Sequence, residues 1–279
     1  MRTWIGTRDG GGLVEDADAR ISVLDHGFTV ADGVFETLKV TAAGPFALSR
    51  HLQRLAASAA TLGLAAPLDE VVRSAVTAVV SANEAEVGGL GRLRITYTGG
   101  VAPLGSDRGD AVPTLVVAMA AASPWPATTT VATVPWTRNE RSALAGVKST
   151  SYAENVIALQ RAHERGASEA ILANTQGNLC EGTGTNVFVV IDGAVLTPPL
   201  SSGCLAGITR ELVLEWFGAE ERTMPLDVLT TADEVFLTSS TRDVHPVVAV
   251  DDRSWAKAGS ISSELRAAFA ARASLDVDP

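Results

Sequence analysis

The chain has 279 residues, a formal net charge of −10 at pH 7 and a sequence pI near 4.9. Its 46% apolar and 19% charged residues are typical of a globular protein, and its acidity argues against a nucleic-acid partner, which needs a basic face. No stretch reaches the roughly 18 apolar residues of a membrane span, and two cysteines and four scattered histidines leave little material for a metal site, so we expect neither a membrane nor a metal partner.

The first half of the chain mixes strand and helix signals. β-branched, alternating stretches indicate strands, and apolar residues at helical spacing indicate amphipathic helices. We expect, in chain order, strands over 21–27 and 34–44, helices over 48–64 and 68–84, and strands over 91–100 and 114–122. A glycine-rich loop over 98–110 separates the last two strands.

The second half begins after the stretch "ASPWPA", whose two prolines stiffen a connection and end the preceding strand. It predicts a strand over 128–136, a helix over 151–167, several strands over 169–199, a helix over 207–218, two strands over 232–253 and a helix over 260–273. These patterns predict two α+β domains, 1–121 and 128–279, joined by a linker over 122–127.

One lysine raises a chemical question. The chain has three lysines against nineteen arginines, and Lys148 lies in the stretch "GVKSTSYAENVIALQRA". A lysine in a dry pocket can lose its proton and become a nucleophile or a base, which arginine cannot do near neutral pH. The alternative is an ordinary surface cation.

Three polar breaks in the second half lie at the ends of predicted elements. They are Glu181 before a Gly-Thr-Gly-Thr turn, Gly207 to Thr209 at a helix start, and Ser239 to Thr241 after a strand. Helix N-termini and hydroxyl groups suit a phosphate, although each break taken alone is better explained by capping or turn formation. A lysine, a carboxylate and a phosphate site together are what pyridoxal 5'-phosphate requires.

The wording and order of these pieces support a family resemblance over roughly Ile21 to Val250. The segments that carry it are "DHGFTVADGVFETLKV", "RHLQRL", "GVKSTSYAENV", "EAILANTQGNLCEGTGTNVFVV", "CLAGITREL" and "ADEVFLTSSTRDVHPV". The chain resembles fold-type IV pyridoxal-phosphate enzymes, the class IV aminotransferase family. This resemblance implies a two-domain α+β fold like that of D-amino-acid aminotransferase, a small-molecule substrate and a homodimer.

The resemblance also implies a role for each matching residue. Lys148 would hold the cofactor as a Schiff base and move the proton, and Glu181 would pair with the pyridine nitrogen. The residues expected to bind the phosphate are Arg54, Ile208, Thr209, Ser240 and Thr241. Tyr152 would contact the phenolic oxygen, although its spacing from Lys148 is one residue shorter than in branched-chain enzymes.

The substrate side is expected to distinguish the reactions of the family. Leu104 and Ser106 stand about where D-amino-acid enzymes carry an Arg-x-His carboxylate clamp, with Arg108 close enough in sequence to substitute. Phe35 stands where those enzymes have a tyrosine. The remaining cations that could meet a substrate carboxylate, or else serve as surface or interface charges, are Arg94 and Arg138.

We therefore predict a 4-amino-4-deoxychorismate lyase, which makes 4-aminobenzoate and pyruvate in folate synthesis, because "LAGVKSTSYAENV" is more like lyase sequences. Glu36 instead follows the transaminase pattern. The alternatives are an aminotransferase of D-amino or branched-chain amino acids, a bifunctional enzyme, and an inactive relative. A cytoplasmic location is expected.

Overall fold

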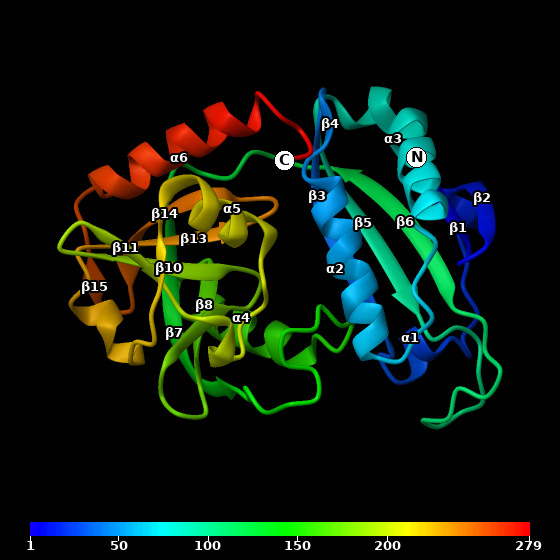
Figure 1. Cartoon of the computed structure of the whole chain (residues 1–279), viewed down its shortest axis with the longest axis horizontal. Coiled ribbons are helices and arrows are strands. Elements are labelled where there is room, and N and C mark those ends of the chain that lie inside the picture. Colours follow the sequence, from blue (N-terminus) through cyan, green and yellow to red (C-terminus); the bar gives the residue numbers. More distant parts are fainter. The chain divides into compact units, whose positions relative to one another are not determined.

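The computed structural model describes all 279 residues and divides into two compact units (Figure 1). Unit 1 consists of Met1–Pro124, Val147–Ser151 and Val277–Pro279, and unit 2 consists of Trp125–Gly146 and Tyr152–Asp276. The chain first passes from unit 1 to unit 2 between Pro124 and Trp125, within the expected linker over 122–127. The segment that carries Lys148, Val147–Ser151, was expected in the C-terminal domain over 128–279. In the structure it belongs to unit 1.

Unit 1 is built on a six-stranded antiparallel sheet with the order β2-β1-β6-β5-β3-β4. Its strands are β1 (Arg2–Thr7), β2 (Gly10–Glu15), β3 (Gly33–Thr41), β4 (Gly44–Pro45), β5 (Leu90–Thr98) and β6 (Thr114–Ala121). Its helices are η1 (Asp16–Asp18), α1 (His26–Thr29), α2 (Leu48–Thr61) and α3 (Asp69–Val87).

The core of unit 1 lies between this sheet and the helices α2 and α3, which cover one of its faces (Figure 1). Alternation along β5 shows why: Leu93 and Ile95 are fully buried toward the helices, whereas Arg92 and Arg94 are exposed on the opposite face. Each such buried aliphatic side chain contributes roughly 1.5–3 kcal/mol to stability. Val147, the residue before Lys148, also packs against this core.

Two features of unit 1 depart from the sequence-based expectation. The strand expected over 21–27 is wrong: the chain turns there and enters α1, whose first turn is capped by the Asp25 carboxylate accepting from the Gly27 N–H at 2.8 Å. The apolar residues of that stretch, such as Val23 at 72% exposure, face outward instead of entering a sheet. The β1–β2 hairpin was missed, although Asp9-Gly10 is a typical hairpin signal.

Unit 2 contains a mixed nine-stranded sheet with the order β12-β11-β10-β13-β14-β7-β8-β9, and β15 pairs with β14. Its strands are β7 (Thr129–Arg138), β8 (Glu169–Asn174), β9 (Leu179–Gly182), β10 (Asn186–Ile191), β11 (Ala194–Thr197), β12 (Glu220–Glu221), β13 (Glu234–Ser239), β14 (Asp243–Val250) and β15 (Arg253–Ser254). Its helices are α4 (Ala153–Glu164), η2 (Leu200–Ser202), α5 (Ile208–Phe217), η3 (Leu226–Thr230) and α6 (Ser260–Ala273).

The helices of unit 2 pack on this sheet at different places. Helix α4 contacts β7 and β8, helix α5 contacts β13, and helix α6 contacts β13 and β14. All six residues of β8 are buried. This agrees with the position of β8 inside the sheet, between β7 and β9, where α4 covers it. The chain contains no helix with the length and apolar character needed to cross a bilayer.

Candidate cofactor and substrate site

Lys148 is held in unit 1 by backbone pairing with the start of β3. The Phe35 N–H donates to the Lys148 carbonyl at 3.0 Å, and the Thr150 N–H donates to the Gly33 carbonyl at 2.8 Å. Between these bonds, Val34 and Ser149 form an isolated antiparallel bridge. The lysine therefore lies on a short extended segment with a fixed register, a placement that its sequence neighbours alone did not indicate.

The side chain of Lys148 lies beside Phe35, together with Arg94. The Lys148 Nζ is 4.3 Å from the centre of the Phe35 ring, and the Arg94 guanidinium carbon is 3.7 Å from it. Phe35 itself is only 4% exposed. The structure thus brings three of the expected site residues together around one aromatic ring, which attracts both cations through its negative face.

Arg54 is bound by a buried carboxylate. Its Nε and one terminal nitrogen donate to the two oxygens of Glu36 at 2.8 and 2.7 Å, and His51 Nδ1 lies 2.6 Å from Glu36. Burial alone would raise the pKa of Glu36, but Arg54 and His51 outweigh it and lower the pKa to about 2. Burial also lowers the pKa of His51, against the opposing effect of Glu36.

Sequence reasoning expected neither Glu36 nor His51 as a neighbour of Arg54. A usable signal was present, because His51 and Arg54 are three residues apart on α2 and therefore share a helix face. Bidentate binding by Glu36 restricts the direction in which the Arg54 guanidinium can present its remaining donors.

The sequence suggests Arg108 as a replacement for the Arg-x-His pair that binds a substrate carboxylate. In the structure, Arg108 binds a carboxylate of the protein itself. Its guanidinium donates to both oxygens of Asp32, at 2.6 and 2.5 Å, and to the Leu62 carbonyl at 2.8 Å. The hydrogen bonds with Asp32 raise the pKa of Arg108. These contacts fasten the loop over 98–110 to the body of unit 1, while Leu104 in the same loop is 77% exposed.

Glu181 is a buried carboxylate of unit 2, at 9% exposure on β9. One of its oxygens accepts from Arg138 Nε at 3.0 Å, and the other accepts from the Leu205 N–H at 2.9 Å. Arg138, expected as a possible substrate contact, is thus a partner of Glu181. Both donors hold the carboxylate in place, and a carboxylate oxygen can accept more than one hydrogen bond, so a pyridinium N–H is a chemically suitable further donor.

The start of α5 has the properties of a phosphate site. Gly207 is its N-cap and supplies no side-chain bond, so Ile208 and Thr209 begin a helix that no side chain caps. A Cβ at Gly207 would collide with Asn186 Oδ1, which explains the glycine. The neighbouring strand β13 carries Thr238, whose buried hydroxyl has no hydrogen-bond partner.

The other expected residues of unit 2 lie at element ends. Ser240 and Thr241 lie in the turn between β13 and β14, and Ser240 is two residues after Thr238. Tyr152 is the N-cap residue of α4 and is half-buried. The structure therefore places Glu181, Tyr152 and the hydroxyl turns in unit 2, and Lys148 and Arg54 in unit 1.

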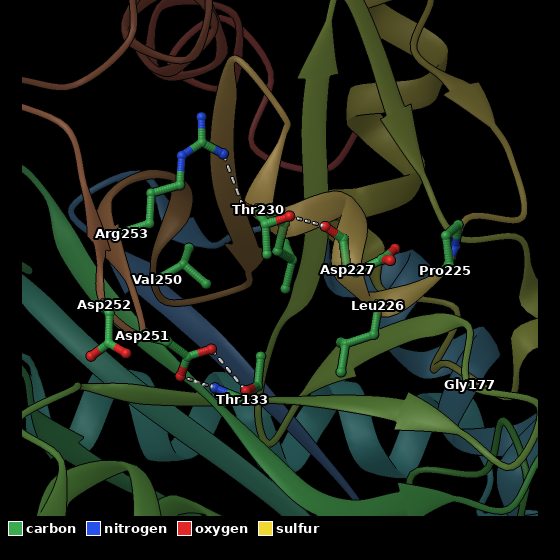
Figure 2. Close-up of a pocket in the computed structure, with 11 residues that line it drawn as sticks. Thr133, Gly177, Pro225, Leu226, Asp227, Thr230, Val250, Asp251, Asp252 and Arg253 are labelled. Carbon is green, nitrogen blue, oxygen red and sulfur yellow. Dashed lines mark hydrogen bonds between the residues drawn. The ribbon is translucent and has the colours of Figure 1, made fainter.

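A separate cavity of about 710 Å³ opens in unit 2 (Figure 2). Asp227, Asp251 and Asp252 line it together with apolar residues, and the Asp251 carboxylate accepts from the backbone and hydroxyl of Thr133. None of the expected cofactor residues lines this cavity, and the chain has no cluster of potential ligands that could hold a metal ion.

Comparison with known proteins identifies the family of the chain. The model of the family Amino-transferase class IV matches residues 33–250. The chain is 33% identical over 274 residues to a putative branched-chain-amino-acid aminotransferase of Methanocaldococcus jannaschii, covering 93% of both chains. It is 31% identical over 255 residues to a D-alanine aminotransferase of Bacillus licheniformis, covering 86% of this chain and 87% of the relative.

Solved structures show the same architecture. A fold IV-transaminase from Curtobacterium pusillum matches with a TM-score of 0.88 and 31% identity, covering 98% of this chain and 99% of that one. This likeness confirms the predicted fold class. Similar solved structures contain pyridoxal phosphate or pyridoxamine 5'-phosphate, so pyridoxal 5'-phosphate is the cofactor. The chain belongs to the class IV aminotransferases.

Proposed function

We propose that this protein is a pyridoxal-phosphate-dependent aminotransferase that moves the amino group of an α-amino acid to a 2-oxo acid. The observation that carries the proposal is the shared contact of Lys148 and Arg94 with the Phe35 ring. It places a primary amine beside an apolar wall and a cation suited to a carboxylate. The relatives described above, which are named as aminotransferases, support the same reaction.

The proposed roles follow from the chemistry of each side chain. The bound cofactor supplies an electron sink that stabilises negative charge at the substrate α-carbon. Lys148 Nζ would take the proton from that carbon and would pass it to the cofactor rather than back to the substrate, because an amine in a dry site is a competent base. Phe35 would exclude water, and Arg94 would hold a substrate carboxylate.

The remaining residues would hold the cofactor. Glu181 would accept the pyridinium N–H, and its contact with Arg138 keeps the carboxylate oriented. Arg54, the N-terminus of α5, Ser240 and Thr241 would bind the phosphate, with Tyr152 near the ring. The uncapped start of α5 and the unpartnered Thr238 hydroxyl support this placement.

We propose an L-amino acid with a branched apolar side chain as the donor. Phe35 offers no hydroxyl to a carboxylate, and Arg108 is bound by Asp32, so neither residue supplies the clamp expected of a D-amino-acid enzyme. A D-amino-acid donor remains the second candidate, because one relative is named a D-alanine aminotransferase. The lyase reaction and the cytoplasmic location stay predictions, and the relatives support the aminotransferase better than the lyase.

We also propose a homodimer that forms through an apolar surface of unit 1. This surface, here called the apolar face, joins the chain around α1 to the loop over 98–112 through a bridge between Asp25 and Val101. Its exposed members are Ile21, Val23, Leu24, Phe28, Val30, Val101, Leu104 and Val112. Exposed apolar residues gathered in this way mark interaction surfaces.

The deciding experiment measures product formation from three substrates. The cofactor-loaded protein is given L-leucine or D-alanine with 2-oxoglutarate, and glutamate is quantified by chiral chromatography. Aminodeoxychorismate is tested in parallel for 4-aminobenzoate fluorescence. Glutamate from L-leucine supports the proposal, whereas 4-aminobenzoate without glutamate would replace it by the lyase. Lys148→Ala is the control for each assay.

A further inference from the structure

Two turns of unit 2 flank the expected cofactor residues, and this inference about them rests on the proposed function. The first turn, 182–185, directly follows Glu181. The buried carboxylate of Glu169 holds it, accepting from the Thr183 N–H at 3.1 Å, from the Thr183 hydroxyl, and from the Thr185 hydroxyl at 3.4 Å. Glu169 thus accepts three of the hydrogen bonds that hold this turn, and Asn155 Nδ2 donates a further one to the Thr183 carbonyl.

The second turn, 239–242, contains Ser240 and Thr241. It is closed by the Arg242 N–H, which lies 3.2 Å from both the Ser239 carbonyl and the Ser239 hydroxyl. The side chain of Arg242 is only 6% exposed, so this turn ends in a buried cation. A turn between two antiparallel strands has no need of such a residue for strand pairing alone.

The buried guanidinium of Arg242 connects the two turns. Its Nη2 lies 3.8 Å from Glu169 Oε2, and its flat face stacks on Trp125, whose ring centre is 3.8 Å away. It also donates at 3.4 Å to the Ser168 carbonyl and to the Thr129 hydroxyl. Glu169 and Arg242 thus form an ion pair in which the two side chains are 4% and 6% exposed.

A buried ion pair is an expensive way to stabilise a fold. Removing two charges from water costs several kcal/mol per ion, and an apolar pair of similar volume often stabilises as well or better. Such pairs are best explained where they fix a position. Here the pair holds the first turn, which follows Glu181, against the second turn, which contains Ser240 and Thr241.

We propose that Arg242 is a positioning residue that, through Glu169, sets the spacing between the ring end and the phosphate end of the cofactor site. The pyridine ring and the phosphate of the cofactor are joined covalently, so both ends bind well only when the protein groups have matching separation. Arg242 does not itself contact the reacting atoms. Its loss should therefore lower the preference for phosphorylated over unphosphorylated cofactor.

The test compares binding of pyridoxal 5'-phosphate and of pyridoxal to the full-length apoprotein by equilibrium dialysis. In Arg242→Gln we expect the affinity for pyridoxal 5'-phosphate to fall by about tenfold or more, which corresponds to losing one charge-assisted interaction, while the affinity for pyridoxal changes less than about twofold. Glu169→Gln should behave similarly. The double variant should be no worse than the worse single variant, because one pair is removed.

Arg253→Gln is the matched control. Arg253 also stacks on a tryptophan, Trp255, at 4.3 Å, and donates to the carbonyls of Leu229 and Ala232, but it lies in the separate cavity of Figure 2. It should keep the wild-type preference for the phosphorylated cofactor. If Arg242→Gln does not fold, Arg242→Lys keeps the charge without the flat stacking surface, and it should show a smaller loss of the same preference.

The inference would be overturned if the Arg242 variants bound pyridoxal 5'-phosphate and pyridoxal with equally reduced affinity, or if the preference for the phosphorylated cofactor were unchanged. Arg242 would then be a residue that contributes to stability only. A loss of preference in Arg253→Gln would also overturn the inference. The wild-type protein separates this failure from that of the proposed function. If wild type binds the cofactor and makes glutamate, only the positioning role is lost; if wild type binds no cofactor, the proposed function itself fails.

Discussion

Glu36 and Arg54 form a two-bond ion pair in which the carboxylate has no exposed surface and the arginine side chain is 11% exposed. Breaking such a pair leaves an uncompensated buried charge. Glu36→Gln should therefore lower the free energy of unfolding by about 3 kcal/mol, measured by urea denaturation, and should weaken binding of the phosphorylated cofactor. Asp69→Asn, which removes the exposed Arg73 pair, should cost about 0.5 kcal/mol or less. Equal losses in the two variants would contradict this account.

Lys148 is expected to be the residue that bonds to the cofactor. Lys148→Ala should abolish the visible absorbance band of the loaded enzyme and lower kcat by about 10³-fold or more, because both the attachment point and the base are removed. Lys257→Ala changes an exposed lysine and should leave spectrum and rate unchanged. A normal visible band in Lys148→Ala would show that another residue holds the cofactor.

Arg94 stacks on Phe35 from the exposed face of β5 and is expected to bind a substrate carboxylate. Arg94→Ala should raise KM for the amino acid or the 2-oxo acid by about tenfold with a smaller change in kcat, because a binding contact is lost rather than the base. Arg92, two residues away on the same face, is the matched control. Steady-state kinetics with both variants make the comparison, and an equal effect of Arg92→Ala would remove the specific role of Arg94.

Phe28 is a member of the apolar face and is 72% exposed. A carboxylate there would be buried without a partner if two copies meet through this face, so Phe28→Asp should shift the protein from dimer to monomer. Light scattering after size-exclusion chromatography measures the mass. Leu275→Asp alters an 87% exposed residue in unit 2 and should leave the mass unchanged. A monomeric wild type would refute the dimer.

His245 should make stability depend on pH. Burial, with Arg242 and Arg266 nearby, lowers the pKa of His245 from 6.5 to about 4. Between these values the unfolded chain binds a proton that the native chain does not, so the free energy of unfolding falls as the pH decreases from 6.5 towards 4. The slope from one such group is at most about 1.4 kcal/mol per pH unit.

Replacing His245 by glutamine removes this group. Urea denaturation at several pH values between 4.5 and 7 should show a shallower slope in His245→Gln than in wild type. The buried His51, whose pKa is also lowered, contributes in the same direction and keeps the remaining slope above zero. Parallel slopes in the two proteins would mean that His245 is protonated equally in the native and unfolded chains.

Much of the local structure was predictable because it depends on short-range periodicity. The helix expected over 48–64 appears as α2, since Leu52 and Leu55 recur at helical spacing and bury against the sheet. The stretch over 21–27 failed because its apolar residues resemble a strand, whereas Asp25 caps a helical turn there. A side-chain cap competes with strand pairing, and alternation alone does not reveal which one forms.

By itself, the sequence determined the family, the cofactor and the identity of Lys148 and Glu181 as candidates, because those depend on residue types in a fixed order. Only the tertiary structure decided the partners of these residues. The Lys148 segment pairs with β3, Arg108 binds Asp32, and Arg138 binds Glu181 across 43 residues of chain. Such contacts join residues distant in sequence, and their geometry is set by sheet register and packing, which no local pattern encodes.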